Sequence, residues 1–228
     1  MLLNPVISRL SGKLVVLASA SPRRLEILSN AGLRIEVVPS WFKETLDKSL
    51  FKNPYDYAVE TAKQKALEVA HRMPFVSYIV IGADTVVTVD GLILEKPTDK
   101  QDAYRMLSRL SGKEHSVFTG VAIVLCHDKS GIQKLNLPLS EEMLWEYSGE
   151  PMDKAGGYGI QALGGMLAEY VRGDFLNVVG FPLNHFCKKA EEHHRIQGLT
   201  GEAWLHSQTH QTHGQPAGCH AICERRPK

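Results

Sequence analysis

Residues 14–28 constrain the fold of this chain more than any other segment, because they join a short apolar run directly to a helix start. The run LVVLA at 14–18 predicts a buried strand. Ser21 then stands at an N-cap position, and Pro22 follows at the first helical position. An apolar stripe continues as far as 30–32, where Asn-Ala-Gly is typical of a helix end. A strand followed at once by a helix is the building unit of an α/β protein.

The same helix start gathers hydroxyl groups and positive charge. Ser19, Ser21, Arg23 and Arg24 all lie in its first turn or just before it. Free backbone N–H groups and the positive end of the helix dipole already favour an anion there, so two added guanidinium groups disfavour an empty helix. The pattern therefore favours bound phosphates. The alternative is an ordinary capped helix with two solvated arginines.

Composition and charge narrow the class of protein. The 228 residues are 43% hydrophobic and 22% charged, as in a globular chain with a substantial core. The net charge of +1 gives no bulk attraction to nucleic acid or membranes, so neither is expected as a partner. We expect no secretory signal and no membrane span, which needs roughly 20 apolar residues. Four cysteines are too few for a disulfide framework, so we expect a reducing, cytoplasmic setting.

Residues 13–190 alternate apolar runs with amphipathic segments, which predicts one α/β domain. The tail at 191–228 is polar and histidine-rich, and we expect it to be disordered because it offers too little apolar surface. Cys219 and Cys223 in the tail could belong to a metal site, but the sequence offers no second ligand pair at zinc spacing. The predicted strands are 14–18, 35–39, 77–83, 92–94 and 117–126, with strand-like alternation continuing over 85–89. The predicted helices are 22–30, 54–72, 98–111, 140–147 and 182–191.

Two charged residues fall where core residues are expected. Lys65 lies in the middle of the apolar stripe of helix 54–72, so it must either extend to solvent or meet an anion. Asp84 follows the apolar run 78–83, at a strand end of the kind where open α/β sheets bind ligands. An aspartate there could also cap a turn.

Three further polar residues extend this set. Glu44 lies in a loop at 41–53, Lys96 follows a hairpin, and Gln161 lies in a glycine-rich segment, where an amide can read the edge of a base. A solvated lysine and a flexible glycine loop are the alternatives. Cations for phosphates, carboxylates for a metal ion or water, and an amide for a base together fit phosphoryl chemistry on a nucleotide. No P-loop motif occurs, which argues against a P-loop enzyme.

Six short motifs occur in order along residues 13–189. They are SASPRR at 19–24, GADT at 82–85, LEKP at 94–97, LSGKEH at 110–115, GEPMDKAGGYGIQ at 149–161 and VGFP at 179–182. In these motifs the chain resembles the Maf family of nucleotide pyrophosphatases. It is most similar to a branch in which a Maf-like domain precedes a methyltransferase domain.

This resemblance implies an α/β fold of the Maf/Ham1 (ITPase-like) type, with a mixed sheet, flanking helices and two lobes around a cleft. It implies hydrolysis of nucleoside triphosphates to the monophosphate and pyrophosphate with a divalent cation, Mg²⁺ or Mn²⁺. The form of the glycine-rich motif is similar to the branch that acts on dTTP and UTP. A homodimer is a further possibility.

The resemblance also implies roles for individual residues. Asp84 matches the family's proton acceptor, and Glu44 and Lys96 match further catalytic positions. Glu44 and Asp84 are the expected metal ligands. The implied substrate-binding residues are Ser19, Arg23, Arg24, Lys65, Thr85 and Gln161.

Two departures from the family pattern support an alternative. The interval 127–139 lacks the alternating Thr-x-Val-x-Phe pattern of a family strand, so we expect one sheet strand to be missing, at a large cost in stability. The likeness also stops after 188, before any methyltransferase domain. Both features suit a splice-variant-like chain that binds nucleotides or is inactive. A third hypothesis is a Ham1-like purine triphosphatase.

Overall fold

One mixed sheet forms the centre of the computed structural model, which describes residues 10, 13–73, 78–127, 131–137, 151–161 and 170–190. Its strands are β1 (Leu14–Leu17), β2 (Ile35–Val37), β3 (Tyr78–Val89), β4 (Leu92–Leu94), β5 (Ser116–His127) and β6 (Gly131–Leu137). The helices are α2 (Pro22–Asn30), α3 (Pro54–Arg72), α4 (Lys100–Leu110) and α5 (Phe175–Val179). Residues 183–190 are also helical. Short 3-10 turns are η1 (Lys48–Leu50), η2 (Pro151–Asp153) and η3 (Ala155–Gly157).

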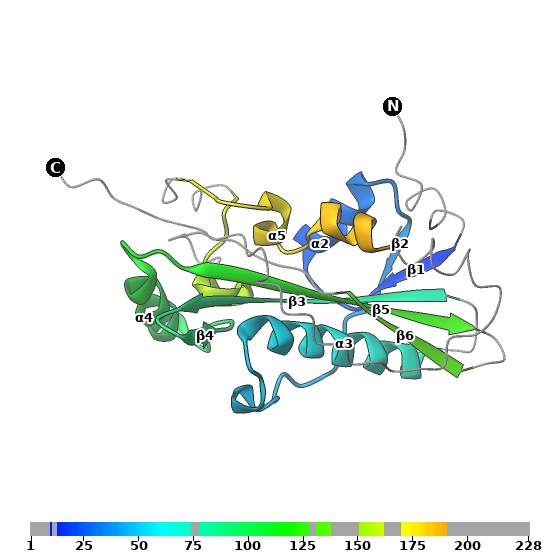
Figure 1. Cartoon of the computed structure of the whole chain (residues 1–228), viewed down its shortest axis with the longest axis horizontal. Helices are drawn as coiled ribbons and strands as arrows, with labels where there is room; N and C mark the ends of the chain where they lie inside the picture. Colours follow the sequence, from blue (N-terminus) through cyan, green and yellow to red (C-terminus); the bar gives the residue numbers. More distant parts are fainter. Residues whose placement is uncertain are drawn as a thin grey trace, which may run out of the picture.

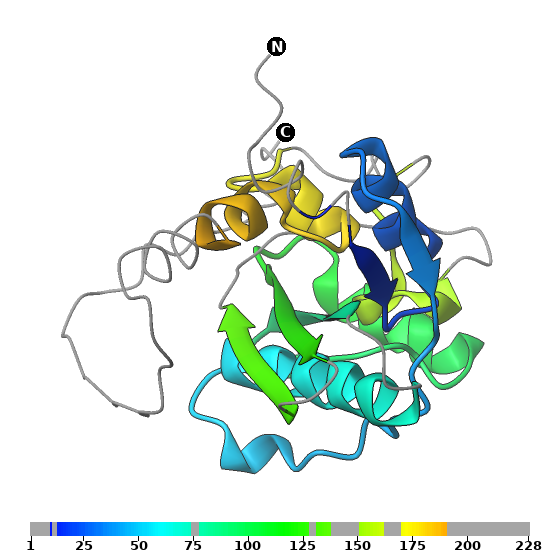
Figure 2. The same ribbon diagram turned by 90° about the vertical axis from the view of Figure 1, so that its right-hand side faces the viewer.

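The strand order is β2-β1-β3-β5-β6, and β4 pairs with β3. β1 runs parallel to β2 and β3, whereas β5 runs antiparallel to β3 and β6. Helix α3 covers one face of the sheet, and α2, α5 and the helical residues 183–190 cover the other (Figures 1 and 2). The expected mixed α/β architecture with flanking helices is confirmed.

β1 is buried on both faces, as its apolar run predicts. Val15 and Leu17 belong to one hydrophobic cluster, which includes residues of α2. Val16 and Ala18 belong to a second cluster, which is formed with α3. Because successive side chains of a strand point to opposite faces, an uninterrupted apolar run supplies both cores at once.

Helix α3 packs unusually close to the sheet at two glycines. A Cβ added to Gly82 would lie 2.1 Å from the carbonyl oxygen of Ala62, and one added to Gly120 would lie 2.4 Å from that of Ala58. The missing side chains therefore let the helix backbone approach β3 and β5. This approach brings the sheet-facing stripe of α3 against the middle of both strands.

β3 has an open edge in its middle. β1 pairs with it only as far as Ile81, and β4 begins to pair at Val87. Between these points, residues 82–86 of β3 have a strand neighbour only on the β5 side. Asp84 therefore lies inside a long strand, and the expectation that it follows a strand end is wrong. It lies opposite the end of β1, which is why it still borders open space.

β6 contradicts the expectation that a sheet strand is missing. Residues 131–137 pair antiparallel with β5 from Val121↔Leu137 to His127↔Gly131. Backbone hydrogen bonding does not depend on one side-chain pattern, so a segment without the expected alternation still completes the edge of the sheet.

The start of α4 also differs from its prediction. The N-cap is Asp99, whose side chain accepts a hydrogen bond from the backbone N–H of Asp102. The predicted capping box from Thr98 to Gln101 does not form. Asp and Thr both cap well, so the two neighbouring positions were hard to distinguish from sequence alone.

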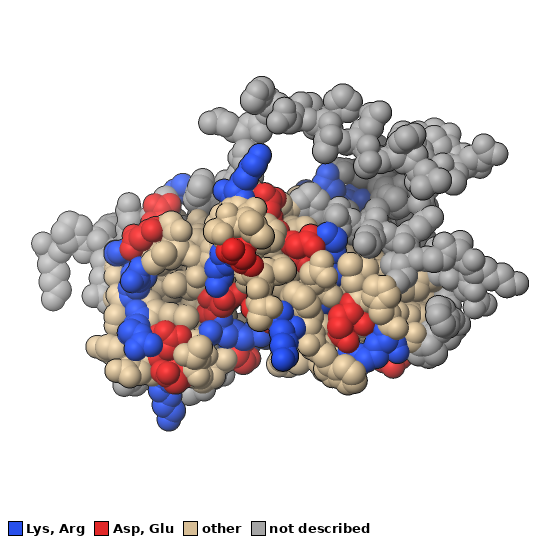
Figure 3. Space-filling model, turned by 90° about the horizontal axis from the view of Figure 1, so that it is seen from below, with Lys and Arg blue, Asp and Glu red and all other residues tan. Residues whose placement is uncertain are grey.

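Several expectations fall outside the described residues, namely the helix at 140–147 and the tail at 191–228. The domain bounds 13–190 stay a prediction. Among the described helices, none is long and apolar enough to cross a membrane. Figure 3 shows acidic and basic side chains intermixed over the described part of the face seen from below.

Substitution of Gly82 by alanine tests the close packing of α3. The added methyl meets helix backbone, which cannot move aside as a flexible side chain can. We expect Gly82→Ala to lower the free energy of unfolding by about 1–3 kcal/mol or more, measured by denaturant titration. Ser29→Ala on the exposed surface of α2 is the control and should stay within about 0.5 kcal/mol. Equal stability of both variants would contradict the packing argument.

Candidate active site

A cleft of about 230 Å³ lies against the open edge of β3. It is lined from one side by the end of β1 and the start of α2, and from another by the glycine-rich segment after η2. All nine residues singled out from the sequence line it, although they come from six separate parts of the chain. They are Ser19, Arg23, Arg24, Glu44, Lys65, Asp84, Thr85, Lys96 and Gln161.

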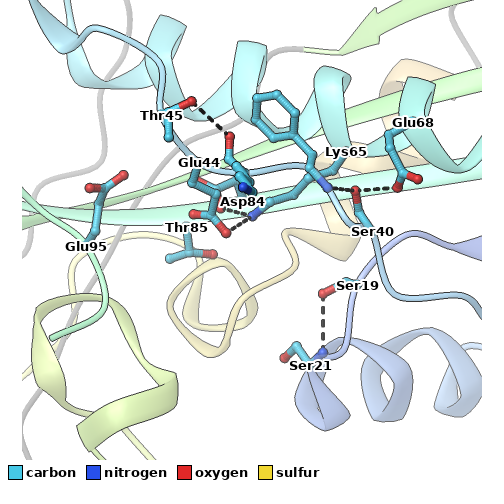
Figure 4. A network of polar contacts seen from close by, with 12 residues as sticks. Ser19, Ser21, Ser40, Glu44, Thr45, Lys65, Glu68, Asp84, Thr85 and Glu95 are labelled. Atoms are coloured by element: carbon cyan, nitrogen blue, oxygen red, sulfur yellow. Dashed lines mark hydrogen bonds and ion pairs between the residues drawn. The ribbon is translucent and has the colours of Figure 1, made fainter. Parts of the chain in front are cut away.

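The centre of the cleft is a buried lysine between two carboxylates (Figure 4). The ammonium of Lys65 lies 2.6 Å from Oδ1 of Asp84 and 2.8 Å from Oε1 of Glu44. The side chains of Lys65 and Asp84 are 10% and 8% exposed, and that of Glu44 is 32% exposed. Lys65 therefore meets anions and does not extend to solvent, which decides between the two alternatives left open by its place on the apolar stripe.

The two carboxylates differ in their proton affinity. Burial raises the pKa of Asp84, and the nearby Glu44 carboxylate raises it further, against the opposing charges of Lys65 and Arg24. For Glu44, partial burial acts upward, but the charge and hydrogen bond of Lys65 lower its pKa overall. Glu44 thus remains ionised, while Asp84 gains a proton more readily than an ordinary aspartate. A carboxylate with a raised pKa is suited to accept a proton during a reaction.

The chemistry of the donor set fits a divalent cation. Glu44 and Asp84 are close together because both contact the Lys65 ammonium, and carboxylate oxygens are the ligands that Mg²⁺ and Mn²⁺ prefer. Among the described residues no group of three or more His, Cys, Asp or Glu side chains could hold a metal ion. Mg²⁺ commonly uses one or two carboxylates together with substrate phosphates and water, so two protein ligands suffice.

The adjacent arginines have different surroundings. Arg24 is buried, and its guanidinium donates to the carbonyl oxygen of Gly180 and to the hydroxyls of Ser19 and Thr85, each at 2.9 Å. Arg24 thus ties α2 to β3 and to the end of α5. Arg23 instead pairs with Asp153 at 3.0 Å. Ser21 occupies the N-cap position as predicted, but its side chain makes no capping hydrogen bond.

Asp153 and Lys154 also line the cleft, although the sequence did not single them out as site residues. They lie in the glycine-rich segment, where the local pattern does not distinguish them from solvated charges of a loop. Lys154 is buried, and it extends over Gly159, where a Cβ would lie 2.6 Å from its Cε. Gly156 and Gly157 have positive φ angles of 69° and 77°, so these glycines serve the backbone turn.

Glu95 connects three segments around the cleft. Its carboxylate accepts a hydrogen bond from the Tyr57 hydroxyl at 2.5 Å and one from Lys48 at 2.6 Å. Its backbone carbonyl accepts from the N–H of Gly156 at 2.9 Å. Glu95 therefore links α3, the turn η1 and the glycine-rich segment beside Lys96.

A mixed α/β fold with a cleft that combines paired carboxylates with lysine and arginine side chains is typical of α/β proteins that bind phosphates. The family model described as Maf-like protein matches residues 14–193, and the chain belongs to this family.

Named relatives are similar over most of the chain. A Homo sapiens protein named "Probable bifunctional dTTP/UTP pyrophosphatase/methyltransferase protein" is 69% identical over 207 residues, which cover 83% of this chain and 33% of that protein. The chain thus matches about a third of the human relative's length. The dTTP/UTP pyrophosphatase of Thermococcus onnurineus (strain NA1) is 46% identical over 186 residues, covering 78% of this chain and 97% of that protein. The enzyme of the same name from Clostridium perfringens (strain 13 / Type A) is 43% identical over 189 residues, covering 78% and 96%.

A buried histidine beside the glycine-rich segment predicts sensitivity to acid. His115 packs edge-on against Tyr158, and burial lowers the pKa of His115 to about 4 against the opposing bond to the Lys113 carbonyl. The unfolded chain binds a proton near pH 6.5 while the folded chain does not, so stability falls as the pH drops from about 6.5 to 4. We expect a loss of about 3 kcal/mol over this range.

Thermal unfolding measured across this pH range tests the expectation. His115→Phe should remove much of the acid dependence because it removes the group that takes up the proton on unfolding. His71→Gln is the control, since His71 is exposed on α3, and it should keep the acid dependence of the unchanged chain. An unaltered pH profile in His115→Phe would show that another group causes the effect.

Tyr57→Phe tests the Glu95 connection. The change removes only the hydroxyl that donates to Glu95, and it leaves the buried ring in place. We expect the free energy of unfolding to fall by about 1–2 kcal/mol, because the part-buried carboxylate loses a donor. Tyr104→Phe is the matched control, as Tyr104 is 66% exposed. Equal values for the two variants in denaturant titration would argue against a structural role of this contact.

Proposed function

We propose that this chain is a nucleoside triphosphate pyrophosphatase that hydrolyses dTTP, UTP or similar nucleotides to the monophosphate and pyrophosphate. The observation that carries the proposal is the pair of carboxylates around buried Lys65, in a cleft that also holds Arg23 and Lys96. The names of the similar proteins support the same activity and the same nucleotides.

The proposed reaction assigns separate tasks to the two kinds of charge. Asp84, with its raised pKa, accepts a proton from the water that attacks the α-phosphorus. Arg23, Lys65 and Lys96 compensate the negative charge of the phosphates as pyrophosphate leaves. Gln161 lies at the cleft with donor and acceptor groups that suit a base edge. Arg24 acts indirectly, because its bonds hold Ser19 and Thr85 in the wall of the cleft.

Glu44 and Asp84 are the residues that would hold a divalent cation, Mg²⁺ or Mn²⁺. When bound, such an ion neutralises phosphate charge and lowers the pKa of a bound water. Lys65 contacts one oxygen of each carboxylate and so holds the two groups close together.

The alternative of an inactive chain is not favoured. Its main support was a missing strand, and β6 now completes the edge of the sheet. The hypothesis of a Ham1-like purine triphosphatase is also less well supported, because the similar proteins are named for dTTP and UTP. Comparing the hydrolysis of dITP with that of dTTP separates these two activities.

We further propose that the protein works in the cytoplasm, which suits a chain with only four cysteines. Nucleic acid is not a proposed partner. Homodimer formation stays a prediction, and sedimentation of the purified chain tests it.

Release of pyrophosphate from a panel of nucleoside triphosphates, with Mg²⁺ or Mn²⁺, tests the activity. We expect dTTP and UTP to be hydrolysed fastest. Failure to release pyrophosphate from any nucleotide would refute the proposed function.

Asp84→Asn tests the assigned proton acceptor. We expect turnover to fall by about 10²–10⁴-fold, because an amide cannot accept the proton. We also expect the fold to be retained, because Glu44 still pairs with the Lys65 ammonium at 2.8 Å. Loss of turnover together with loss of folding would instead indicate a structural role.

A further inference from the structure

The carboxylate of Asp153 lies between two cations of the cleft. Its Oδ2 is 3.0 Å from Nη1 of Arg23, and its Oδ1 is 3.0 Å from Nζ of Lys154. Arg23 belongs to α2 and Asp153 ends η2, so the contact joins segments that are 130 residues apart in sequence. All three residues line the cleft. The two oxygens of one carboxylate thus contact two cations that a phosphate group could also bind.

The cations are more firmly held than the anion between them. The side chains of Lys154 and Arg23 are 9% and 19% exposed, whereas that of Asp153 is 56% exposed. Lys154 is confined by its passage over Gly159, where only the missing Cβ leaves room for its chain. An exposed carboxylate is readily solvated when it leaves an ion pair. Asp153 can therefore leave the two cations for water, and the buried Lys154 ammonium then takes phosphate oxygens in its place.

The other acidic residues of the cleft differ from Asp153 in this respect. Asp84 is 8% exposed and Glu44 is 32% exposed, and both share the ammonium of Lys65. Separating Asp84 from Lys65 would leave a buried charge without its partner, which is costly. Among the cleft carboxylates, Asp153 is the one whose displacement costs least.

We propose that Asp153 is an internal counter-anion, which holds Arg23 and Lys154 until the phosphates of a nucleotide replace it and which returns as pyrophosphate leaves. The inference rests on the proposed function for its substrate class, and it adds Lys154 to the phosphate-binding residues. Phosphate oxygens match the planar guanidinium of Arg23 well, so they compete effectively for the same donors. Because ligand and carboxylate compete, Asp153 weakens the binding of the phosphate chain and limits inhibition by the product.

Titration of the purified chain with inorganic pyrophosphate alone, without divalent cation, tests the competition by calorimetry. Asp153→Asn keeps the size of the side chain and removes its charge, so we expect pyrophosphate to bind about three- to tenfold tighter. Asp90→Asn is the matched control. Asp90 also pairs with a lysine, Lys113, at 2.5 Å, and it lies outside the cleft. Asp90→Asn removes the same charge, and the dissociation constant for pyrophosphate should stay unchanged.

Two further variants test the role of Lys154. Lys154→Met should weaken pyrophosphate binding, because it removes one of the two cations. Gly159→Ala should weaken it as well while leaving the charge intact, since the added methyl meets Cε and Cδ of Lys154 at 2.6 and 2.8 Å and displaces them. If both variants weaken pyrophosphate binding, the effect depends on the position of the Lys154 ammonium and not on net charge alone.

Three outcomes would overturn the inference. Unchanged or weaker pyrophosphate binding in Asp153→Asn would show that the carboxylate only joins two segments, or helps to bind the ligand. Equal tightening in Asp90→Asn would indicate a bulk charge effect. Absence of pyrophosphate binding in both the unchanged chain and Asp153→Asn would show that these cations form no phosphate site. The titration needs no turnover, so an inactive chain refutes the proposed function and still leaves this result decisive.

Discussion

The ammonium of Lys65, held between the carboxylates of Asp84 and Glu44, is the interaction on which the rest of the cleft depends. A buried charge is tolerated only when its partners are close and well placed, so the structure must fix three segments relative to one another. Gly82 and Gly120 make this possible, because they let α3 approach β3, which carries Asp84, and its neighbour β5. Backbone packing thus determines where the charges meet.

The cleft exists because strand β3 is longer than its neighbours on one side. β1 ends at Leu17, opposite Ile81, and β4 ends at Leu94, opposite Val87, so the middle of β3 has no strand neighbour on this side. Side chains on both faces of β3 reach this gap. Asp84 points toward Lys65 of α3, and Thr85 bonds to Arg24 of α2. Adjacent residues of one strand therefore connect the two helical layers at the site.

Much of the fold could be predicted from local patterns. The apolar runs placed β1, β3 and β5, and the helix 54–72 was predicted with the bounds that α3 has, because Pro54 marks its start. The pattern failed for β6, where backbone pairing forms a strand without the expected alternation. It also displaced the start of α4 by one residue, where Asp99 caps the helix. Asp99 and Thr98 are chemically similar as caps, so the local pattern did not choose between them.

Some residues of the site could be predicted from the local sequence, and others could not. The residue types needed for phosphate chemistry were evident from the sequence, because a lysine on an apolar stripe and a cationic helix start conflict with ordinary packing. Asp153 and Lys154 were missed, since nothing in the local pattern separates them from other charges in a loop. Their partner Arg23 lies 130 residues away, so only the folded chain brings them together.

The sequence by itself determined the kinds of side chain that the cleft contains, because hydrophobic periodicity and misplaced charges are properties of the local chain. Only the tertiary structure decided what each of them does. Arg23 and Arg24 are adjacent and chemically identical, yet Arg24 is buried with three protein acceptors while Arg23 faces an exposed carboxylate. The physical reason is that successive residues of a helix point in different directions. The charge and accessibility that each one meets are therefore set by the elements packed around the helix.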